Sequence, residues 1–120
     1  TGEVAPMLEV DVVRGVRVVT VPEEVDITNA PGLRAALLQA AADGSPALVV
    51  DMTRTRFCDS AGLRVLVDAH KQALAEGRAV LLAVPAAAVL RVLEITGIDQ
   101  AIPHFASLDE AVTHAAESAG

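Results

Sequence analysis

The sequence predicts a single α/β domain: a mixed, mostly parallel sheet of four or five strands, an opening antiparallel hairpin and about four helices. Three observations support this prediction. A chain of 120 residues has the usual size of one domain. Short apolar runs alternate with amphipathic stretches, which is typical of parallel strands joined by helices. Only Arg14 and Gly15 separate the first two apolar runs, which suits a tight hairpin because glycine tolerates a positive φ.

In chain order the expected elements alternate between strand and helix after the hairpin. They are strands at 8–12 and 16–21, a helix that begins near Pro31, a strand at 47–52, a helix at 60–76, a strand at 79–84, a helix at 86–95, a short strand at 101–105 and a last helix at 107–117. We expect the domain to span residues 8–117. Residues 1–7 show no periodicity and are expected to be a flexible lead-in, and residues 118–120 a flexible C-terminus.

The alternation of apolar and polar residues, together with turn and capping residues, supports the elements expected in the first half of the chain. Residues 8–12 alternate apolar and polar side chains, as a half-buried strand does. A polar loop is expected at residues 22–28, after which Thr28 or Asn29 can cap the next helix. Pro31 falls in its first turn, where a missing N–H costs little. The spacing predicts a buried stripe of Leu33, Leu37, Leu38 and Ala41.

Residues typical of helix ends and strand edges support the elements expected in the second half of the chain. The helix at 60–76 precedes Gly77, which suits the left-handed residue after a helix end. Pro103 interrupts residues 101–105, so that strand is expected at an edge of the sheet. Ser107 and Glu110 have the spacing of a capping box for the last helix. The helix at 60–76 is expected to carry Leu63, Leu66, Val67, His70 and Leu74 on one apolar face.

Composition limits the classes of function. The chain is 52% apolar without Trp or Tyr, so its core must be aliphatic. The net charge of -7 opposes nucleic-acid binding. The sequence contains no run of about 18 apolar residues, the length that a membrane-spanning helix needs. Cys58 is the only cysteine, and no Cys/His cluster has metal-ligand spacing, so we expect no metal and no cofactor. Without a signal-peptide pattern, a cytoplasmic location is expected.

Three interpretations are open for Ser60, which follows Asp59 at the start of a predicted helix. Ser60 could be a nucleophile, because the segment is close to the G-x-S-x-G elbow of hydrolases. Cys58 replaces the first glycine of that motif, however, and no spacing selects a histidine as base, so we do not expect an enzyme. Asp59 could simply cap the helix.

The third interpretation is a phosphate acceptor. Backbone N–H groups and the helix dipole favour added negative charge at the start of a helix, where Ser60 lies. Arg64 follows four residues later and could pair with a phosphoserine on the same face.

Residues 57–66, Phe57-Cys58-Asp59-Ser60-Ala61-Gly62-Leu63-Arg64-Val65-Leu66, resemble the phosphorylation-site signature of bacterial anti-sigma factor antagonists, the STAS-domain family. Residues 24–26 and 28–33 are similar to the family's first loop and helix, and residues 85–99 and 107–111 to its C-terminal third. The resemblance extends over residues 8–116. It departs from the family at Glu23, often a glycine, and at Ala61, which replaces a second hydroxyl found in many members.

The resemblance implies a regulatory switch in transcription rather than an enzyme. In this family the unphosphorylated antagonist binds an anti-sigma factor that is also a serine kinase, which releases a sigma factor. Phosphorylation ends that binding, and a serine phosphatase restores it; Ser60 matches the acceptor. The alternative is a STAS scaffold or transporter accessory subunit that is never phosphorylated. The resemblance and the motif together predict a partner-binding set of Asp26, Asp59, Ser60, Ala61, Gly62, Leu63 and Arg64.

Overall fold

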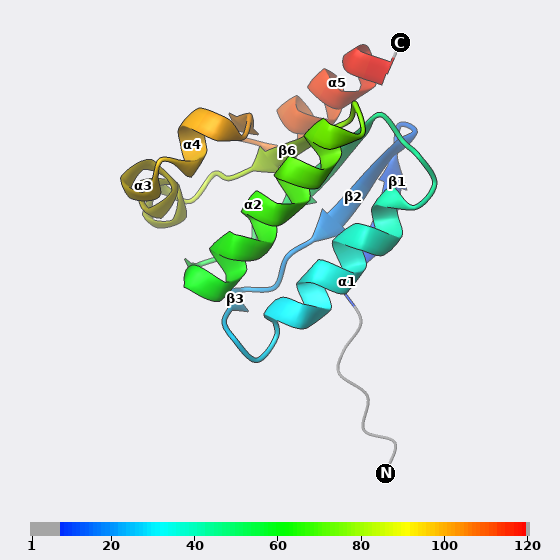
Figure 1. The fold of residues 1–120 in the computed structure, drawn as a ribbon. Coiled ribbons are helices and arrows are strands. Elements are labelled where there is room, and N and C mark those ends of the chain that lie inside the picture. Colours follow the sequence, from blue (N-terminus) through cyan, green and yellow to red (C-terminus); the bar gives the residue numbers. More distant parts are fainter. Residues whose placement is uncertain (1–7, 120) are drawn as a thin grey trace.

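A five-stranded sheet with the order β1-β2-β4-β6-β7 forms the centre of the fold, in a computed structural model that describes residues 8–119 (Figure 1). Its strands are β1 (Val10–Val13), β2 (Val16–Thr20), β4 (Ala47–Asp51), β6 (Ala79–Ala83) and β7 (His104–Phe105). β1 pairs antiparallel with β2, and the remaining pairs are parallel. The predicted mixed, mostly parallel sheet is therefore confirmed.

The turn between β1 and β2 confirms the predicted hairpin. Val13 is paired with Val16, so Arg14 and Gly15 form a two-residue loop. Both have positive φ, 50° for Arg14 and 80° for Gly15. Such a turn matches the right-handed twist of the two strands that it joins.

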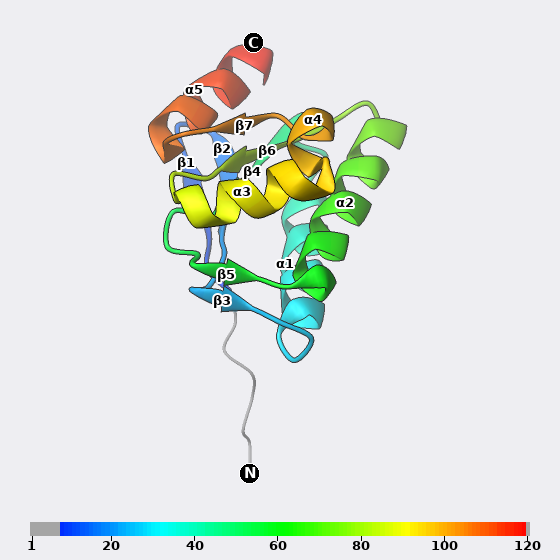
Figure 2. The same cartoon turned by 90° about the vertical axis from the view of Figure 1, so that its left-hand side faces the viewer.

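Helices cover both faces of the sheet (Figures 1 and 2). They are α1 (Ala30–Ala41), α2 (Ser60–Ala75), α3 (Ala87–Thr96), α4 (Ile98–Ala101) and α5 (Leu108–Ala119). The first four helices contribute to one core cluster, which includes Val19 and Leu82 of the sheet. α5 packs on the opposite face, where Val112 joins a second cluster with Val49.

A second, separate sheet lies at one end of the molecule and was not expected from the sequence. β3 (Glu24–Val25) and β5 (Phe57–Cys58) pair in parallel beside the start of α2 (Figure 2). The predicted polar loop at residues 22–28 therefore contains a strand. Two-residue strands have no measurable alternation, which is why the sequence pattern did not reveal them.

Three local predictions were wrong. Leu38 was expected in the buried stripe of its helix and Leu74 on the apolar face of its own, but their exposed fractions are 49% and 60%, because the rest of residues 8–119 leaves those sides of α1 and α2 largely uncovered. The strand expected at 101–105 is limited to β7, because Ala101 belongs to α4 and Pro103 cannot donate to a ladder.

The chain ends are only partly described. The expected flexible lead-in at residues 1–7 lies outside the described residues, as does residue 120. α5 continues to Ala119, two residues beyond the expected end at 117. Across residues 8–119, the helices are all too short or too polar to cross a membrane.

Candidate functional site

The start of α2 confirms the predicted cap. Asp59 has an extended backbone, and its Oδ1 accepts hydrogen bonds from the N–H groups of Ala61 at 2.9 Å and Gly62 at 3.2 Å. A carboxylate in this place satisfies N–H groups that have no partner within the helix. Ser60, the first residue of α2, is exposed to solvent directly beside this cap.

Gly62 lets α2 lie directly against the β3–β5 sheet. A Cβ atom on this glycine would stand 2.6 Å from Cys58 Sγ and 2.6 Å from Val25 Cγ1, closer than real Cβ contacts allow. Gly62 and Cys58 are both buried. Burial also raises the pKa of the Cys58 thiol to about 11, with a smaller contribution from the Asp59 carboxylate.

The loop after β3 is ordered by the side chain of Asp26. Its Oδ1 accepts hydrogen bonds from the N–H of Thr28 at 2.9 Å and from the Thr28 hydroxyl, with a longer one from the N–H of Asn29. These hydrogen bonds, the Thr28 hydroxyl first, lower the pKa of Asp26 below its ordinary value. The carboxylate is therefore held in place as an anion.

Asn29 occupies the N-cap position of α1, but its side chain makes no cap hydrogen bond to the helix. Its Oδ1 instead accepts from the N–H of Asp26 at 2.8 Å, and its Nδ2 donates to the carbonyl of Glu24 at 2.8 Å. The predicted capping role was therefore wrong for the Asn29 side chain, which ties the loop back to β3.

The pairing of β3 with β5 brings the two predicted segments together. Val25 is in register with Cys58, so Asp26 and Asp59 each follow their strand by one residue at the same edge. Ser60 and Arg64 are exposed, Ala61 and Leu63 are half-buried, and Gly62 is buried. Leu63 packs against the main core cluster. Of the predicted partner-binding residues, Ser60 and Arg64 are therefore at the surface, whereas Gly62 lies beneath it.

Two apolar residues of this surface were missed at the level of sequence. The exposed fraction is 76% for Ile27, beside Asp26, and 53% for Phe57, in β5. Its position between the polar residues Asp26 and Thr28 was the available signal for Ile27. Ile27 and Phe57 both lie in or beside the paired strands β3 and β5, which carry the two parts of the candidate site.

A shallow hollow lies between the N-terminal halves of α1 and α2, and is called the α1–α2 hollow below. Its lining is largely apolar and includes Ile27, Pro31, Ala35, Leu38, Ala61 and Arg64. Ala61 follows Ser60 directly, so the hollow adjoins the candidate acceptor.

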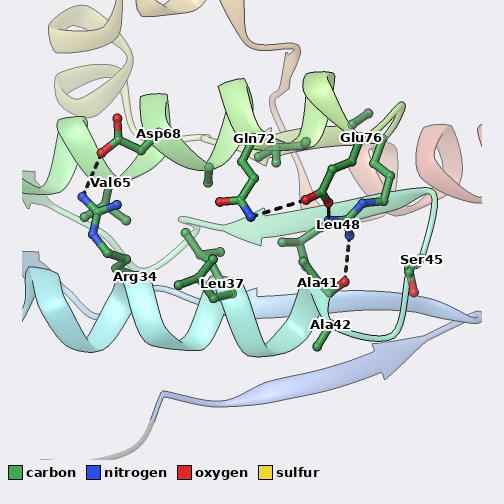
Figure 3. A pocket seen from close by; sticks show the side chains of 17 residues that line it. Arg34, Leu37, Ala41, Ala42, Ser45, Leu48, Val65, Asp68, Gln72 and Glu76 are labelled. Carbon is green, nitrogen blue, oxygen red and sulfur yellow. Dashed lines mark hydrogen bonds and ion pairs between the residues drawn. The ribbon is translucent and has the colours of Figure 1, made fainter.

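A second cavity of about 360 Å³ lies further along the same two helices (Figure 3). Arg34 of α1 reaches across to Asp68 of α2, with 2.9 Å between Nη2 and Oδ2. At the other end Arg78 donates to the carbonyl of Ala41 at 2.8 Å. None of the seven predicted partner-binding residues lines this cavity.

Neither His70 nor His114 supports the nucleophile interpretation. His70 lies in α2 ten residues after Ser60, which places it about 15 Å further along the helix axis at 1.5 Å per residue. His114 belongs to α5, where its ring packs in a tilted arrangement against Phe105, with 5.1 Å between the ring centroids. A general base must come within hydrogen-bond reach of the hydroxyl that it activates.

Comparisons with known proteins agree with this arrangement. Residues 7–111 match the family model described as the STAS domain. The anti-sigma-F factor antagonist RsfB of Mycobacterium tuberculosis is 30% identical over 101 residues, 82% of this chain and 80% of the relative. A solved anti-sigma factor antagonist from Mycobacterium paratuberculosis is 35% identical, with a TM-score of 0.77 over 90% of this chain and 92% of that one. The phosphorylated form of the Bacillus cell fate determinant SpoIIAA shares the fold at 19% identity, with a TM-score of 0.67 over 89% of this chain and 97% of that one.

Proposed function

The chain belongs to the STAS domain family, and from this membership we propose that it is an anti-sigma factor antagonist switched by phosphorylation of Ser60. The unphosphorylated protein binds an anti-sigma factor with serine kinase activity and thereby releases a sigma factor. A serine phosphatase reverses the modification. The protein itself is a cytoplasmic binding module rather than an enzyme.

The observation that carries the proposal is the placement of Ser60. Its side chain is exposed at the first position of α2, so a kinase can reach the hydroxyl without unfolding the domain. The N-terminus of a helix also stabilises a negative charge, so the modified protein stays folded. Two of the relatives above are named as anti-sigma factor antagonists, which supports the class of partner.

The switch works by local charge. A phosphate adds about -1.5 to -2 charges beside the Asp59 carboxylate, on a surface with exposed Ile27 and Phe57. Packing that surface against a partner would strip water from the phosphate and bring like charges together. A hundredfold loss of affinity requires only about 2.8 kcal/mol, which one such clash supplies.

A pull-down with the unphosphorylated protein identifies the anti-sigma factor, and a kinase reaction with ATP then tests the proposal. Mass analysis should show one phosphate on Ser60, none on Ser60→Ala, and unchanged labelling of the control Ser107→Ala. The modified protein should lose affinity for the kinase. Labelling of Ser60→Ala would contradict the acceptor assignment. If kinase treatment leaves the affinity for the true partner unchanged, the result would instead support a constitutive scaffold or transporter accessory subunit.

A further inference from the structure

The α1–α2 hollow is apolar but open to solvent. Ile27 precedes α1 and Leu38 lies two turns along it, and both keep much of their side-chain surface exposed. Pro31, Ala35 and Leu38 recur at helical spacing, so α1 presents an apolar stripe to the hollow, with Arg34 beside it. Single exposed apolar residues are normal on a monomer, but a concave group of them is typical of a binding surface.

The charges at the rim of the hollow indicate what kind of segment would occupy it. Arg34 is already held by Asp68 of α2 (Figure 3). Arg64, in contrast, is exposed, and its guanidinium makes no hydrogen bond or ion pair with any residue from 8 to 119. A partner that placed a carboxylate here would neutralise a free guanidinium in a chain whose net charge is -7.

Ser60 is coupled to the hollow through its neighbours. Ala61 and Arg64, which follow it by one and four residues, both line the hollow. A phosphate on Ser60 would lie on the same helical face as Arg64, so the two would pair. That pairing removes the guanidinium from any partner and places charge at the mouth of an apolar surface.

We propose that the α1–α2 hollow is the socket for one large apolar side chain of the anti-sigma factor, with a neighbouring acidic residue of that protein paired to Arg64. This inference rests on the proposed function, because the occupant is the same partner. It extends the docking surface from Ser60 along α1 to Leu38. Phosphorylation then blocks the socket as well as repelling the partner.

Two exposed leucines in helices provide a matched test. Leu38→Gln removes an apolar side chain that lines the hollow and also the edge of the second cavity. Leu74→Gln makes the same change on α2, where the side chain lines neither of them. Affinity for the purified anti-sigma factor, measured by calorimetry, should fall at least tenfold for Leu38→Gln and less than twofold for Leu74→Gln. Thermal unfolding of both variants confirms that they are folded.

A second pair of variants fills the space instead of emptying it. Ala35→Trp should block the socket and weaken binding at least tenfold, while Ala88→Trp, at an exposed alanine of α3, should leave it unchanged. Arg64→Gln should weaken binding several-fold, because it removes the charge that pairs with the partner's acidic residue. Arg91→Gln changes an exposed arginine of α3 and should leave binding unchanged.

The outcomes separate the inference from the function on which it rests. If the unmodified protein binds no anti-sigma factor, the proposed function fails. If it binds one, and Leu38→Gln and Ala35→Trp bind as tightly as their controls, only the socket is wrong. Sedimentation that shows a dimer dissolved by Leu38→Gln would assign the hollow to a second copy of this chain and overturn the inference.

Discussion

The backbone N–H of Asp59 donates a hydrogen bond to the carbonyl oxygen of Val25, at 3.0 Å. This bond continues the pairing of β3 with β5 by one residue and joins the segment that holds Ser60 to the loop that holds Asp26. Arg56 adds a second link, since its N–H donates to the carbonyl of Glu23 at 2.7 Å. The two parts of the candidate site are thus positioned by backbone groups, whatever side chains surround them.

Gly62→Ala should destabilise the domain. The added methyl group meets Cys58 and Val25 at 2.6 Å, and overpacking of this kind typically costs about 1–3 kcal/mol of unfolding free energy. Urea denaturation measures the change. Gly32→Ala is the matched control, because this glycine of α1 has open space around it and alanine favours a helix by about 0.5–1 kcal/mol. Equal stability for Gly62→Ala would show that α2 can move away from the small sheet.

Asp59→Ala should lower the unfolding free energy by about 1 kcal/mol, because the N–H groups of Ala61 and Gly62 lose their acceptor. Asp59→Asn keeps an oxygen in that place and should restore most of the loss. Denaturant titration of the two variants distinguishes the cap from the charge. An asparagine as damaging as alanine would show that the negative charge, and not the hydrogen bonds, stabilises the helix start.

Ser60→Asp should change binding and not folding. The residue is exposed, so its unfolding free energy should stay within about 0.5 kcal/mol of the original. Affinity for the anti-sigma factor should fall about a hundredfold, as a mimic of the phosphate. Ser60→Asn has nearly the same shape without the charge and should retain most of the affinity. A loss as large with asparagine would assign the effect to size.

Stability should fall between pH 9 and 11 because of Cys58. The thiol pKa is raised from 9.0 to about 11 in the folded protein, so the unfolded chain ionises first as the pH rises. The contribution of this thiol is fully present below pH 9 and is lost as the pH approaches 11. At about 1.4 kcal/mol per pH unit, the loss approaches about 3 kcal/mol.

Cys58→Ala lacks this titration and serves as the comparison. Unfolding free energies measured in urea from pH 8 to 11 should decline less steeply for the variant than for the original protein. Other alkaline titrations are common to both chains and cancel in the difference. Parallel declines would show that the thiol ionises as readily in the folded state as in the unfolded one.

The hairpin and the parallel core could be predicted from the sequence because they depend on local signals. Gly15 marks a tight turn, and the aliphatic runs of β4 and β6 are long enough to indicate buried strands. β3, β5 and α4 span two to four residues, which is too short for any periodicity. Their formation depends on neighbours that only the folded chain brings together.

The candidate site was predictable to a similar extent. Ser60 and its cap follow from residue types at a helix start, and their resemblance to a known signature added the proposed partner. The exposed position of Leu38 could not be predicted, because exposure depends on which helix faces the rest of the fold leaves uncovered. The periodicity of apolar residues alone therefore led to the wrong prediction that Leu38 is buried. Phe57 lies in a strand of two residues, too short to show which side is buried.

Ser60 stands outside the five-stranded sheet and belongs to neither core cluster. A phosphate there should leave the fraction of unfolded chains unchanged. Because cellular proteases act largely on unfolded chains, the two forms should have the same lifetime. Under the proposed function, phosphorylation and its reversal would therefore change the activity of a fixed pool of this protein in both directions, with no need for synthesis or degradation.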